Sequence, residues 1–269
     1  MRRPTDSTRS VRLCAAVLCA AALGLAPTAQ AQDLTVAAAS DLQTVFPSLA
    51  DQFQRASGHA VKPTFGSSGN FFAQIQNGAP FDIFFSADSD YPKHLEAAHL
   101  AAPNSLRVYA RGRIVLWTRN DSGVDVRRGL AVLSDPRVRR IAIANPEHAP
   151  YGRAAVAALE HERLYGGVKS KLVLGENISQ AAQFVQSGNA DAGLLALSLA
   201  LAPALRGAGT YVEVPAVFYP PIEQAAVILK ASRRKDGARR FLAFLARPDS
   251  AQALRDAGFL DPRPAAAAR

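Results

Sequence analysis

Short apolar runs alternate along this chain with stretches of helical periodicity. The runs occupy residues 34–38, 60–65, 81–85, 113–117, 140–144, 171–174, 192–196 and 225–229. Between the first two, apolar residues from Leu42 to Phe53 share one helical face, and Ser40 stands at the expected N-cap. Because the runs are apolar throughout, both faces of the sheet are expected to be covered and its strands to be largely parallel. The order predicts an α/β fold.

A repeated pattern predicts two lobes of similar build. From Val61 the order is strand, glycine, helix, Asn77–Gly78 and then Asp82 before the next strand. From Lys171 the same order recurs and ends in Ser187–Gly188 and Asp191. Both aspartates are interpreted as turn or strand-edge residues rather than catalytic carboxylates. Chance recurrence of α/β elements is the alternative explanation of the repeat.

The chain is expected to form two Rossmann-like lobes joined by a hinge of two strands, near Arg113 and near Pro221. The first lobe is assigned residues 32–113 and 222–262, and the second lobe residues 114–221. Residues 263–269, which follow the last helical pattern, are expected to form a frayed tail.

The first 31 residues have the features of a cleaved signal peptide. Four arginines precede an apolar stretch over 13–26, which is too short to span a bilayer, and Ala29-Gln30-Ala31 forms a cleavage site. The protein is therefore expected to be exported. Cys14 and Cys19 lie within this segment, so the exported chain has no cysteine for a disulfide, a thiol nucleophile or a thiolate metal site.

The exported chain is basic. Loss of residues 1–31, with four arginines and one aspartate, lowers the formal charge from +9 to +6. Basic clusters such as Arg137, Arg139 and Arg140 have no interleaved aromatic residues, which favours a solvated surface over nucleic-acid binding. The surplus charge is also suited to steering a small anion.

Four turns join a strand to a helix and carry the informative residues. They are 38–41 (AASD), 66–69 (GSSG), 149–152 (APYG) and 176–179 (ENIS). Unpaired N–H groups and the helix dipole make such turns suitable for anions. Each serine alone is more often an N-cap, but in an α/β fold all four turns lie at the carboxyl ends of the strands. Two turns from each lobe are expected to face one another across a cleft.

The turns offer no lysine or arginine to a ligand. A neutral cage of N–H and O–H donors suits a dehydrated, doubly charged oxyanion. A monoprotonated phosphate also needs an acceptor for its proton, which Asp41 is able to supply. We expect Asp41 to contribute its backbone N–H, with the carboxylate turned out to solvent, because a carboxylate facing a dianion repels it.

Enzyme interpretations lack the necessary residues. The five histidines have no metal-ligand spacing and are interpreted as surface residues. The 66–69 turn is neither a nucleophile elbow nor a phosphate-binding P-loop. No catalytic residues, cofactor or metal cation are therefore assigned. An exported enzyme and the effector domain of a regulator are the alternatives from other classes, and the second conflicts with a signal peptide.

Five segments together resemble the periplasmic molybdate-binding proteins of ABC transporters, a branch of the type II solute-binding fold. The segments are 37–40 (AAAS), 66–69 (GSSG), 81–88 (FDIFFSAD), 145–152 (NPEHAPYG) and 221–227 (PIEQAAV). The resemblance implies a periplasmic, monomeric protein that holds molybdate or tungstate between its lobes and delivers it to an inner-membrane permease. A binding protein for another tetrahedral oxyanion, such as sulfate or phosphate, is the alternative.

The resemblance also implies the ligand contacts. Ser40 and Ser68 would give hydroxyl and backbone donors from the first lobe, and Ile178 would give a backbone N–H from the second. Some members carry a ligand-binding tyrosine after the strand that matches 193–195, where this chain has Ala196 and Leu197. Tyr151 aligns with a tyrosine donor in other members and would replace it. With Asp41, these residues form the expected binding set.

Overall fold

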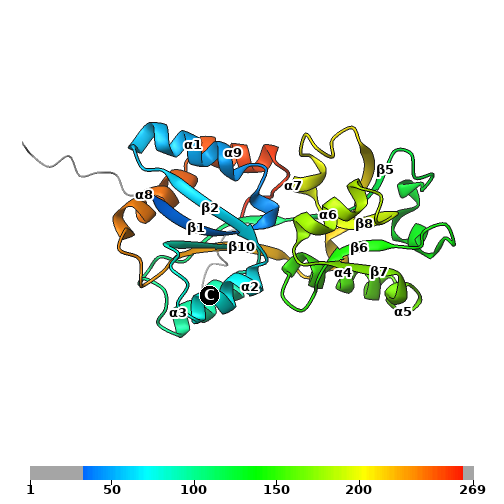
Figure 1. Cartoon of the computed structure of the whole chain (residues 1–269), viewed down its shortest axis with the longest axis horizontal. Helices are drawn as coiled ribbons and strands as arrows, with labels where there is room; N and C mark the ends of the chain where they lie inside the picture. Colours follow the sequence, from blue (N-terminus) through cyan, green and yellow to red (C-terminus); the bar gives the residue numbers. More distant parts are fainter. Residues whose placement is uncertain (1–32, 263–269) are drawn as a thin grey trace, which may run out of the picture. The chain divides into compact units, whose positions relative to one another are not determined.

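The computed structural model describes residues 33–262, so the expected signal peptide and frayed tail lie outside the described residues. Within the described part, the chain forms two mixed five-stranded sheets with helices around them (Figure 1). The expected α/β architecture with two lobes is confirmed. None of the described helices is long and apolar enough to cross a membrane.

Each lobe is built on one sheet, and the two sheets have the same plan. The first has the order β2-β1-β3-β10-β4 and the second β7-β6-β8-β5-β9. The strands are β1 (Leu34–Ala39), β2 (Val61–Gly66), β3 (Ile83–Ser86), β4 (Arg107–Gly112), β5 (Ile114–Arg119), β6 (Ile141–Ala144), β7 (Leu172–Gly175), β8 (Ala192–Ala196), β9 (Gly209–Glu213) and β10 (Ile222–Ile228).

The expectation of largely parallel sheets holds for the direction of the strands, but each sheet contains one reversed strand that was not expected. In the first sheet β1 pairs in parallel with β2 and β3, whereas β10 is antiparallel to both β3 and β4. The second sheet repeats this, with β5 antiparallel to β8 and β9. The reversed strand of each sheet, β5 or β10, is the one that the chain enters when it crosses from the other lobe. No α-helix precedes it as in a strand–helix–strand unit, so it is free to run against its neighbours.

The strands at the sheet edges were the ones not predicted. All eight apolar runs correspond to strands, but β4 and β9 had no prediction. Both strands lie at the end of their sheet, and most of their residues are half-buried or exposed. An edge strand that faces solvent needs no continuous apolar run, so the periodicity gave no signal there.

Helices cover both faces of each sheet. In the first lobe they are α1 (Phe46–Ser57), α2 (Ser68–Gln76), α3 (Asp90–Ala97), α8 (Lys235–Leu245) and α9 (Pro248–Asp256). The second lobe has α4 (Pro150–His161), α5 (Tyr165–Val168), α6 (Ile178–Gln186) and α7 (Leu197–Ala200), and the short 3-10 helices are η1 (Ser40–Leu42), η2 (Val126–Ser134), η3 (Lys169–Lys171) and η4 (Ala216–Phe218).

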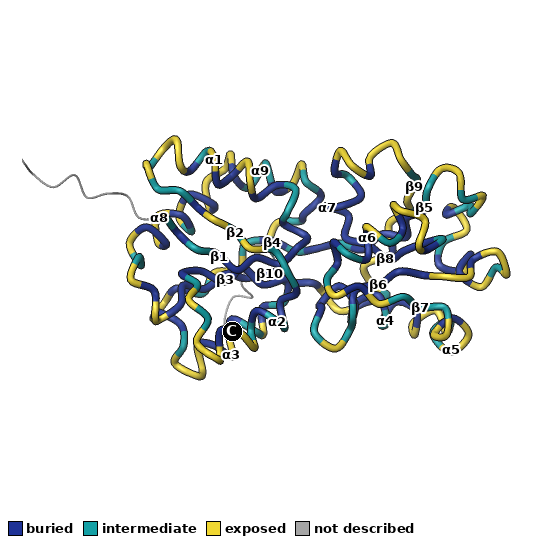
Figure 2. Tube along the Cα trace, in the orientation of Figure 1, coloured by how far each residue is buried: buried dark blue, intermediate teal, exposed yellow. Residues whose placement is uncertain are grey.

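Alternate residues of the first sheet enter two separate cores. Val36 and Phe85 pack with Phe46 and Phe241 under α1 and α8, whereas Phe84 packs on the other face under α2 and α3. The rings of Phe46 and Phe85 meet edge to face at 5.2 Å between centroids. Figure 2 shows the strands buried and the outer helix surfaces exposed. Because both faces of the sheet are buried, these strands could be predicted from their continuous apolar runs.

The repeat seen in the sequence corresponds to a repeated unit of structure. Strand, helix and strand follow one another as β2-α2-β3 and as β7-α6-β8. Asp82 accepts the N–H of Thr35 on β1, and Asp191 accepts the N–H groups of Arg139 and Arg140 ahead of β6, each at 2.8 Å. Asp82 therefore ties the start of β3 to β1, and Asp191 ties the start of β8 to β6, in agreement with their interpretation as structural residues.

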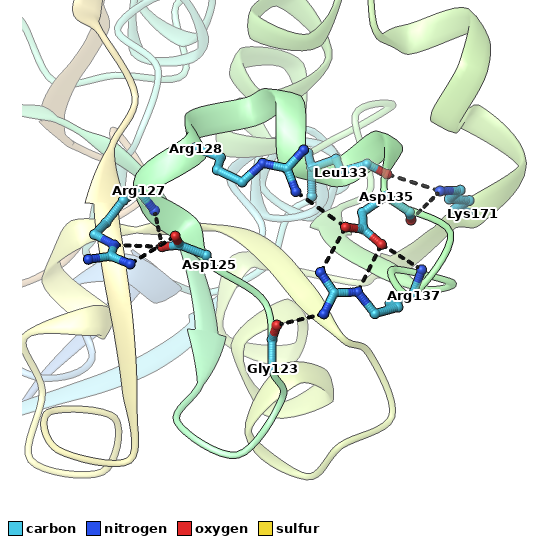
Figure 3. A network of polar contacts seen from close by, with 8 residues as sticks. All are labelled: Gly123, Asp125, Arg127, Arg128, Leu133, Asp135, Arg137 and Lys171. Atoms are coloured by element: carbon cyan, nitrogen blue, oxygen red, sulfur yellow. Dashed lines mark hydrogen bonds and ion pairs between the residues drawn. The ribbon is translucent and has the colours of Figure 1, made fainter.

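Surface ion pairs surround the basic residues of η2 (Figure 3). Arg137 lies 2.9 Å from Asp135 and Arg128 lies 3.3 Å from it, while Lys171 donates to the carbonyl of Leu133 at 3.0 Å. The hydrogen bond from Arg137 is the main reason that the pKa of Asp135 falls well below its usual range. Arg137 is exposed, as expected of a solvated surface.

Candidate binding site between the lobes

The five residues expected to bind a ligand line one small cavity. Residues from all four turns form its wall: Ala39, Ser40, Asp41, Gly66, Ser67, Ser68, Ala87, Ala149, Pro150, Tyr151, Asn177 and Ile178. The cavity lies between the carboxyl ends of the parallel strands of both sheets, as expected for an α/β fold. No lysine, arginine or histidine is among these lining residues.

The first turn brings Ser40 against the second lobe. The expectation that Ser40 caps a helix is wrong, because η1 begins at Ser40 itself and its side chain makes no cap bond. Instead, the Ser40 hydroxyl donates to the side-chain oxygen of Asn177 at 3.2 Å, and the N–H of Ser179 lies 3.4 Å from the Ser40 oxygen. The hydroxyl therefore lies at the contact between the lobes.

The second turn leaves the start of α2 without a side-chain cap. Ser67 occupies the N-cap position but donates its hydroxyl to the carbonyl of His148 in the other lobe, at 2.6 Å. The Ser68 hydroxyl accepts the N–H of Ala87 at 2.9 Å. Since a hydroxyl accepts and donates at once, this bond orients the Ser68 oxygen and leaves its proton for another acceptor.

Asp41 is the residue whose side chain differs most from expectation. We expected the carboxylate to face solvent, and this was wrong, because Asp41 is fully buried. Its Oδ2 accepts the hydroxyl of Tyr151 at 2.9 Å and the side-chain N–H of Gln224. Burial raises the pKa of Asp41 to about 6, although the bonds from Gln224 and Tyr151 limit the rise. The remaining oxygen, Oδ1, has no hydrogen-bond partner among the described residues.

The Tyr151 side chain reaches from the second lobe into the first, where its hydroxyl lies beside Gly112. It lies in the first turn of α4, is 2% exposed, and directs its hydroxyl to Asp41 across the lobe contact. A Cβ at Gly112, the last residue of β4, would overlap that hydroxyl. Burial, reinforced by the charge of Asp41, raises the pKa of Tyr151 well above its ordinary value, so the phenol keeps its proton.

The polar chain continues into the first lobe. Gln224 on β10 is fully buried, donates to Asp41, and accepts the hydroxyl of Tyr109 on β4 at 2.6 Å. Its side-chain nitrogen also lies 3.2 Å from the Tyr151 oxygen. Tyr109, Gln224, Asp41 and Tyr151 therefore form one buried network at the point where the chain crosses between the lobes.

The fourth turn is capped differently from the others. Asn177 is the N-cap of α6 and accepts the N–H groups of Ser179 and Gln180 at 3.0 and 3.1 Å. The N–H of Ile178, the first residue of the helix, stays outside this cap. Ile178 thus has a backbone donor to offer to the cavity while Asn177 satisfies the donors behind it.

Polar contacts outside the cavity hold the lobes together. Arg153 of α4 pairs with Asp88 at 2.5 Å and donates to the Tyr91 hydroxyl at 3.2 Å. Asn70 donates to Glu176 on the other side of the contact. Asp88 also accepts the N–H of Asp90, the first residue of α3, at 2.9 Å.

Sequence reasoning did not assign a site role to Gln224, Asn177 or His148. Gln224 lies in β10, beside Glu223 and just before the apolar run 225–229. His148 was interpreted as a surface residue, but its ring nitrogen lies 3.0 Å from the Ser67 hydroxyl in the lobe contact. The sequence does not distinguish Gln224 from its polar neighbour Glu223; only the fold shows that Gln224 is buried and therefore needs hydrogen-bond partners.

A larger cavity of about 710 Å³ lies elsewhere in the first lobe. It is bounded by β4, β10, α8 and α9, with mainly apolar walls and Arg107, Arg239 and Arg255 among its lining. None of the four turns contributes to its lining. The donors of the four turns converge on the smaller cavity alone.

The chain belongs to the family of bacterial extracellular solute-binding proteins, whose family model matches residues 34–260. Among its relatives, the molybdate-binding protein ModA of Azotobacter vinelandii is 39% identical over 235 residues, covering 87% of this chain and 92% of the relative. The molybdate-binding protein ModA of Rhodobacter capsulatus is 36% identical over 238 residues, covering 88% of this chain and 92% of the relative.

A solved structure agrees with the fold. The periplasmic molybdate-binding protein of Azotobacter vinelandii matches with a TM-score of 0.80 and 37% sequence identity, covering 86% of this chain and 100% of that one. The resemblance and the type II fold expected from the sequence are therefore confirmed.

Proposed function

We propose that this protein captures molybdate in the cavity between its lobes and holds tungstate in the same way. The observation that carries the proposal is the convergence of uncapped helix starts from both lobes on one small cavity without a lysine or arginine in its wall. Similarity to two molybdate-binding relatives supports the choice of anion. Tungstate matches molybdate in charge and almost in size.

The proposed ligand set combines hydroxyl and backbone donors. Ser40 and Ser68 donate from the first lobe through hydroxyl and N–H groups, and Asp41 adds its backbone N–H. Tyr151 donates its hydroxyl and Ile178 its backbone N–H from the second lobe. All five residues are at most 4% exposed, so each donor acts on the anion away from bulk water.

A cage of neutral donors favours an anion with two negative charges and no proton. Short hydrogen bonds to fixed N–H and O–H groups strengthen with the charge of the acceptor. Sulfate has the same charge but a smaller radius, and a closed cage fitted to a larger anion leaves part of the donor set too far from it. Size therefore separates molybdate from sulfate, and charge separates both from neutral solutes.

The wider role follows from the family. We infer an exported protein, released by cleavage after residue 31, that acts as a monomer and delivers its anion to an inner-membrane permease. No catalytic role is proposed. Among residues 33–262, no three histidine, cysteine or acidic side chains gather as they would around a metal ion.

Calorimetric titration of the purified exported chain tests the proposal. We expect heat with molybdate and with tungstate, and much weaker binding of sulfate and phosphate. Ser68→Ala should weaken molybdate binding by about 1–3 kcal/mol, because one donor to a buried charged acceptor is lost. Ser48→Ala, an exposed serine on α1, is the matched control and should bind normally. Binding of sulfate without binding of molybdate would overturn the proposal.

A further inference from the structure

The buried network at the crossing between the lobes contains a conflict of charge. Asp41 lines the cavity in which the proposed site takes up a dianion, yet its carboxyl group is fully buried and bonded on Oδ2. An ionised carboxylate in the wall of a water-poor cavity repels a dianion strongly. The same carboxylate also engages the proton of Tyr151, which is needed as a donor to the anion.

One proton resolves both conflicts. A proton on Oδ2 of Asp41 neutralises the carboxyl group and turns it into a donor toward the Tyr151 oxygen, 2.9 Å away. The Tyr151 proton is then released from Asp41 and is free to point to an oxygen of the anion. The proton comes from solvent, no covalent bond changes, and Tyr151 stays a neutral phenol throughout.

We propose that the site binds its oxyanion together with one proton, which is held by Asp41 and reverses the hydrogen bond between Asp41 and Tyr151. This inference rests on the proposed function, because it concerns the state of the wall when the anion is bound. It makes Asp41 a determinant of specificity: the charge taken up is that of the dianion plus one proton.

The surroundings of Asp41 fit this exchange. The titratable groups that face it are Tyr151 from α4 and Tyr109 from β4, and both phenols are held neutral by burial. The other elements packed on η1 present neutral groups, namely Gln224 from β10, Ser198 from α7, Gly66 from β2 and Asn177–Ile178 at the start of α6. No cation in this set competes with a proton for the carboxylate.

Gln224 accommodates both protonation states. Its amide nitrogen donates to Oδ2 of Asp41 and lies 3.2 Å from the Tyr151 oxygen, while its amide oxygen accepts from Tyr109. When Asp41 is protonated, Oδ2 keeps a lone pair for Gln224. Because the Tyr109 hydroxyl both donates and accepts, the amide is also able to reverse. Gln224 is therefore a positioning residue for Tyr151.

The protonation state of Asp41 before the anion binds determines the pH range in which proton uptake is measurable. Burial raises the pKa of this carboxyl to about 6. At pH 7.5 to 8.5 it is therefore mostly ionised without the anion and, on this inference, protonated with it. Linkage then requires that affinity falls up to tenfold for each unit of rising pH.

Calorimetry in paired buffers measures the proton directly. Molybdate is titrated into the exported chain at pH 8 in two buffers of different ionisation enthalpy, both free of sulfate and phosphate. The difference in heat gives the protons taken up per anion, and we expect close to one for the wild-type chain. Asp41→Asn mimics the protonated group, and we expect no uptake and an affinity that is flat from pH 7 to pH 8.5.

The outcomes separate the two proposals. Asp51→Asn, an exposed aspartate on α1, is the matched control and should take up the same proton as the wild-type chain. Binding heat that is equal in both buffers would overturn the inference while leaving molybdate capture intact. No heat with molybdate would instead remove the proposed function. Should Asp41→Asn fail to fold, the wild-type measurement in two buffers decides alone.

Discussion

The two lobes share one sheet plan but differ in what they bury. The first lobe encloses most of the buried polar side chains of the described residues, including both fully enclosed aspartates, Asp41 and Asp82. The core of the second lobe is almost wholly aliphatic and alanine-rich around one tryptophan, Trp117. In the proposed ligand set, the same topology serves two tasks: the first lobe would supply side-chain donors, and the second mainly a backbone donor and Tyr151.

Equivalent turns show how that difference arises. The equivalent helices α2 and α6 follow β2 and β7, and each has nine residues and is preceded by a glycine, Gly66 or Gly175. A Cβ at either glycine would crowd its own helix, at 2.9 Å from Phe71 or 2.6 Å from Ala181. The N-cap, however, is Ser67 without a cap bond in one lobe and Asn177 with two in the other. Asn177 thus satisfies donors at the start of α6 from within its own lobe, whereas the Gly69 N–H at the start of α2 is bonded to the His148 carbonyl of the other lobe at 2.9 Å.

The largest expected difference in stability between the lobes concerns Asp82 and Asp191, the aspartates at equivalent positions of the repeat. Asp82 accepts from Thr35 and Ser232 and faces Arg234 at 3.4 Å, whereas half-buried Asp191 accepts two backbone N–H groups. Asp82→Ala should lower the free energy of unfolding by about 3–5 kcal/mol, because it leaves buried partners unpaired. Asp191→Ala should lower it by about 1–2 kcal/mol. Urea denaturation measures both, and the reverse order would contradict this comparison.

The next effect depends on pH and belongs to the first lobe alone. Because burial raises the folded pKa of Asp41 from 3.8 to about 6, the folded state binds this proton more tightly than the unfolded chain. The cost of ionised Asp41 is therefore absent below about pH 4, grows as the pH rises, and is complete above pH 6. Without anion, Asp41→Asn should become more stable than wild type by up to about 3 kcal/mol at pH 8. A difference in melting that is the same at pH 4 and pH 8 would contradict the assignment.

The two lobes are packed tightly against each other at Gly69. A Cβ there would lie 2.6 Å from the carbonyl oxygen of His148 in the opposite lobe. Gly69→Ala should therefore leave the stability of the first lobe unchanged but weaken molybdate binding at least tenfold, or about 1.4 kcal/mol. Paired unfolding and titration experiments separate the two effects. Normal affinity would mean that binding does not require this contact.

The smallest effect tests the two N-caps against each other. Asn177→Ala should lower the free energy of unfolding by about 1 kcal/mol, because two N–H groups of α6 lose their acceptor. Ser67→Ala should change stability little, since Ser67 makes no cap bond, yet it should weaken anion binding by removing the bond to His148. Equal losses of stability would show that both serve only as caps.

Sequence alone predicted the interior of this molecule better than its margins. Strands such as β1 and β3 are buried on both faces, so their apolar runs marked them, whereas β4 and β9 at the sheet edges carry no such pattern. The donor turns were predictable because a serine or glycine between a strand and a helix can be recognised from the residues next to it in sequence. The direction of the Asp41 side chain was not, because it depends on Tyr151 and Gln224, which are 110 and 183 residues away in sequence.

The ion pair of Arg153 and Asp88 joins the two lobes outside the cavity, with side chains 39% and 27% exposed. Dissolved ions reach such a pair, and their screening weakens its attraction as salt concentration rises. Under the proposed function, the protein works outside the cytoplasm, where the salt concentration varies with the surroundings. Rising salt would then weaken one contact that holds the lobes around the anion, and dilute surroundings would favour its retention.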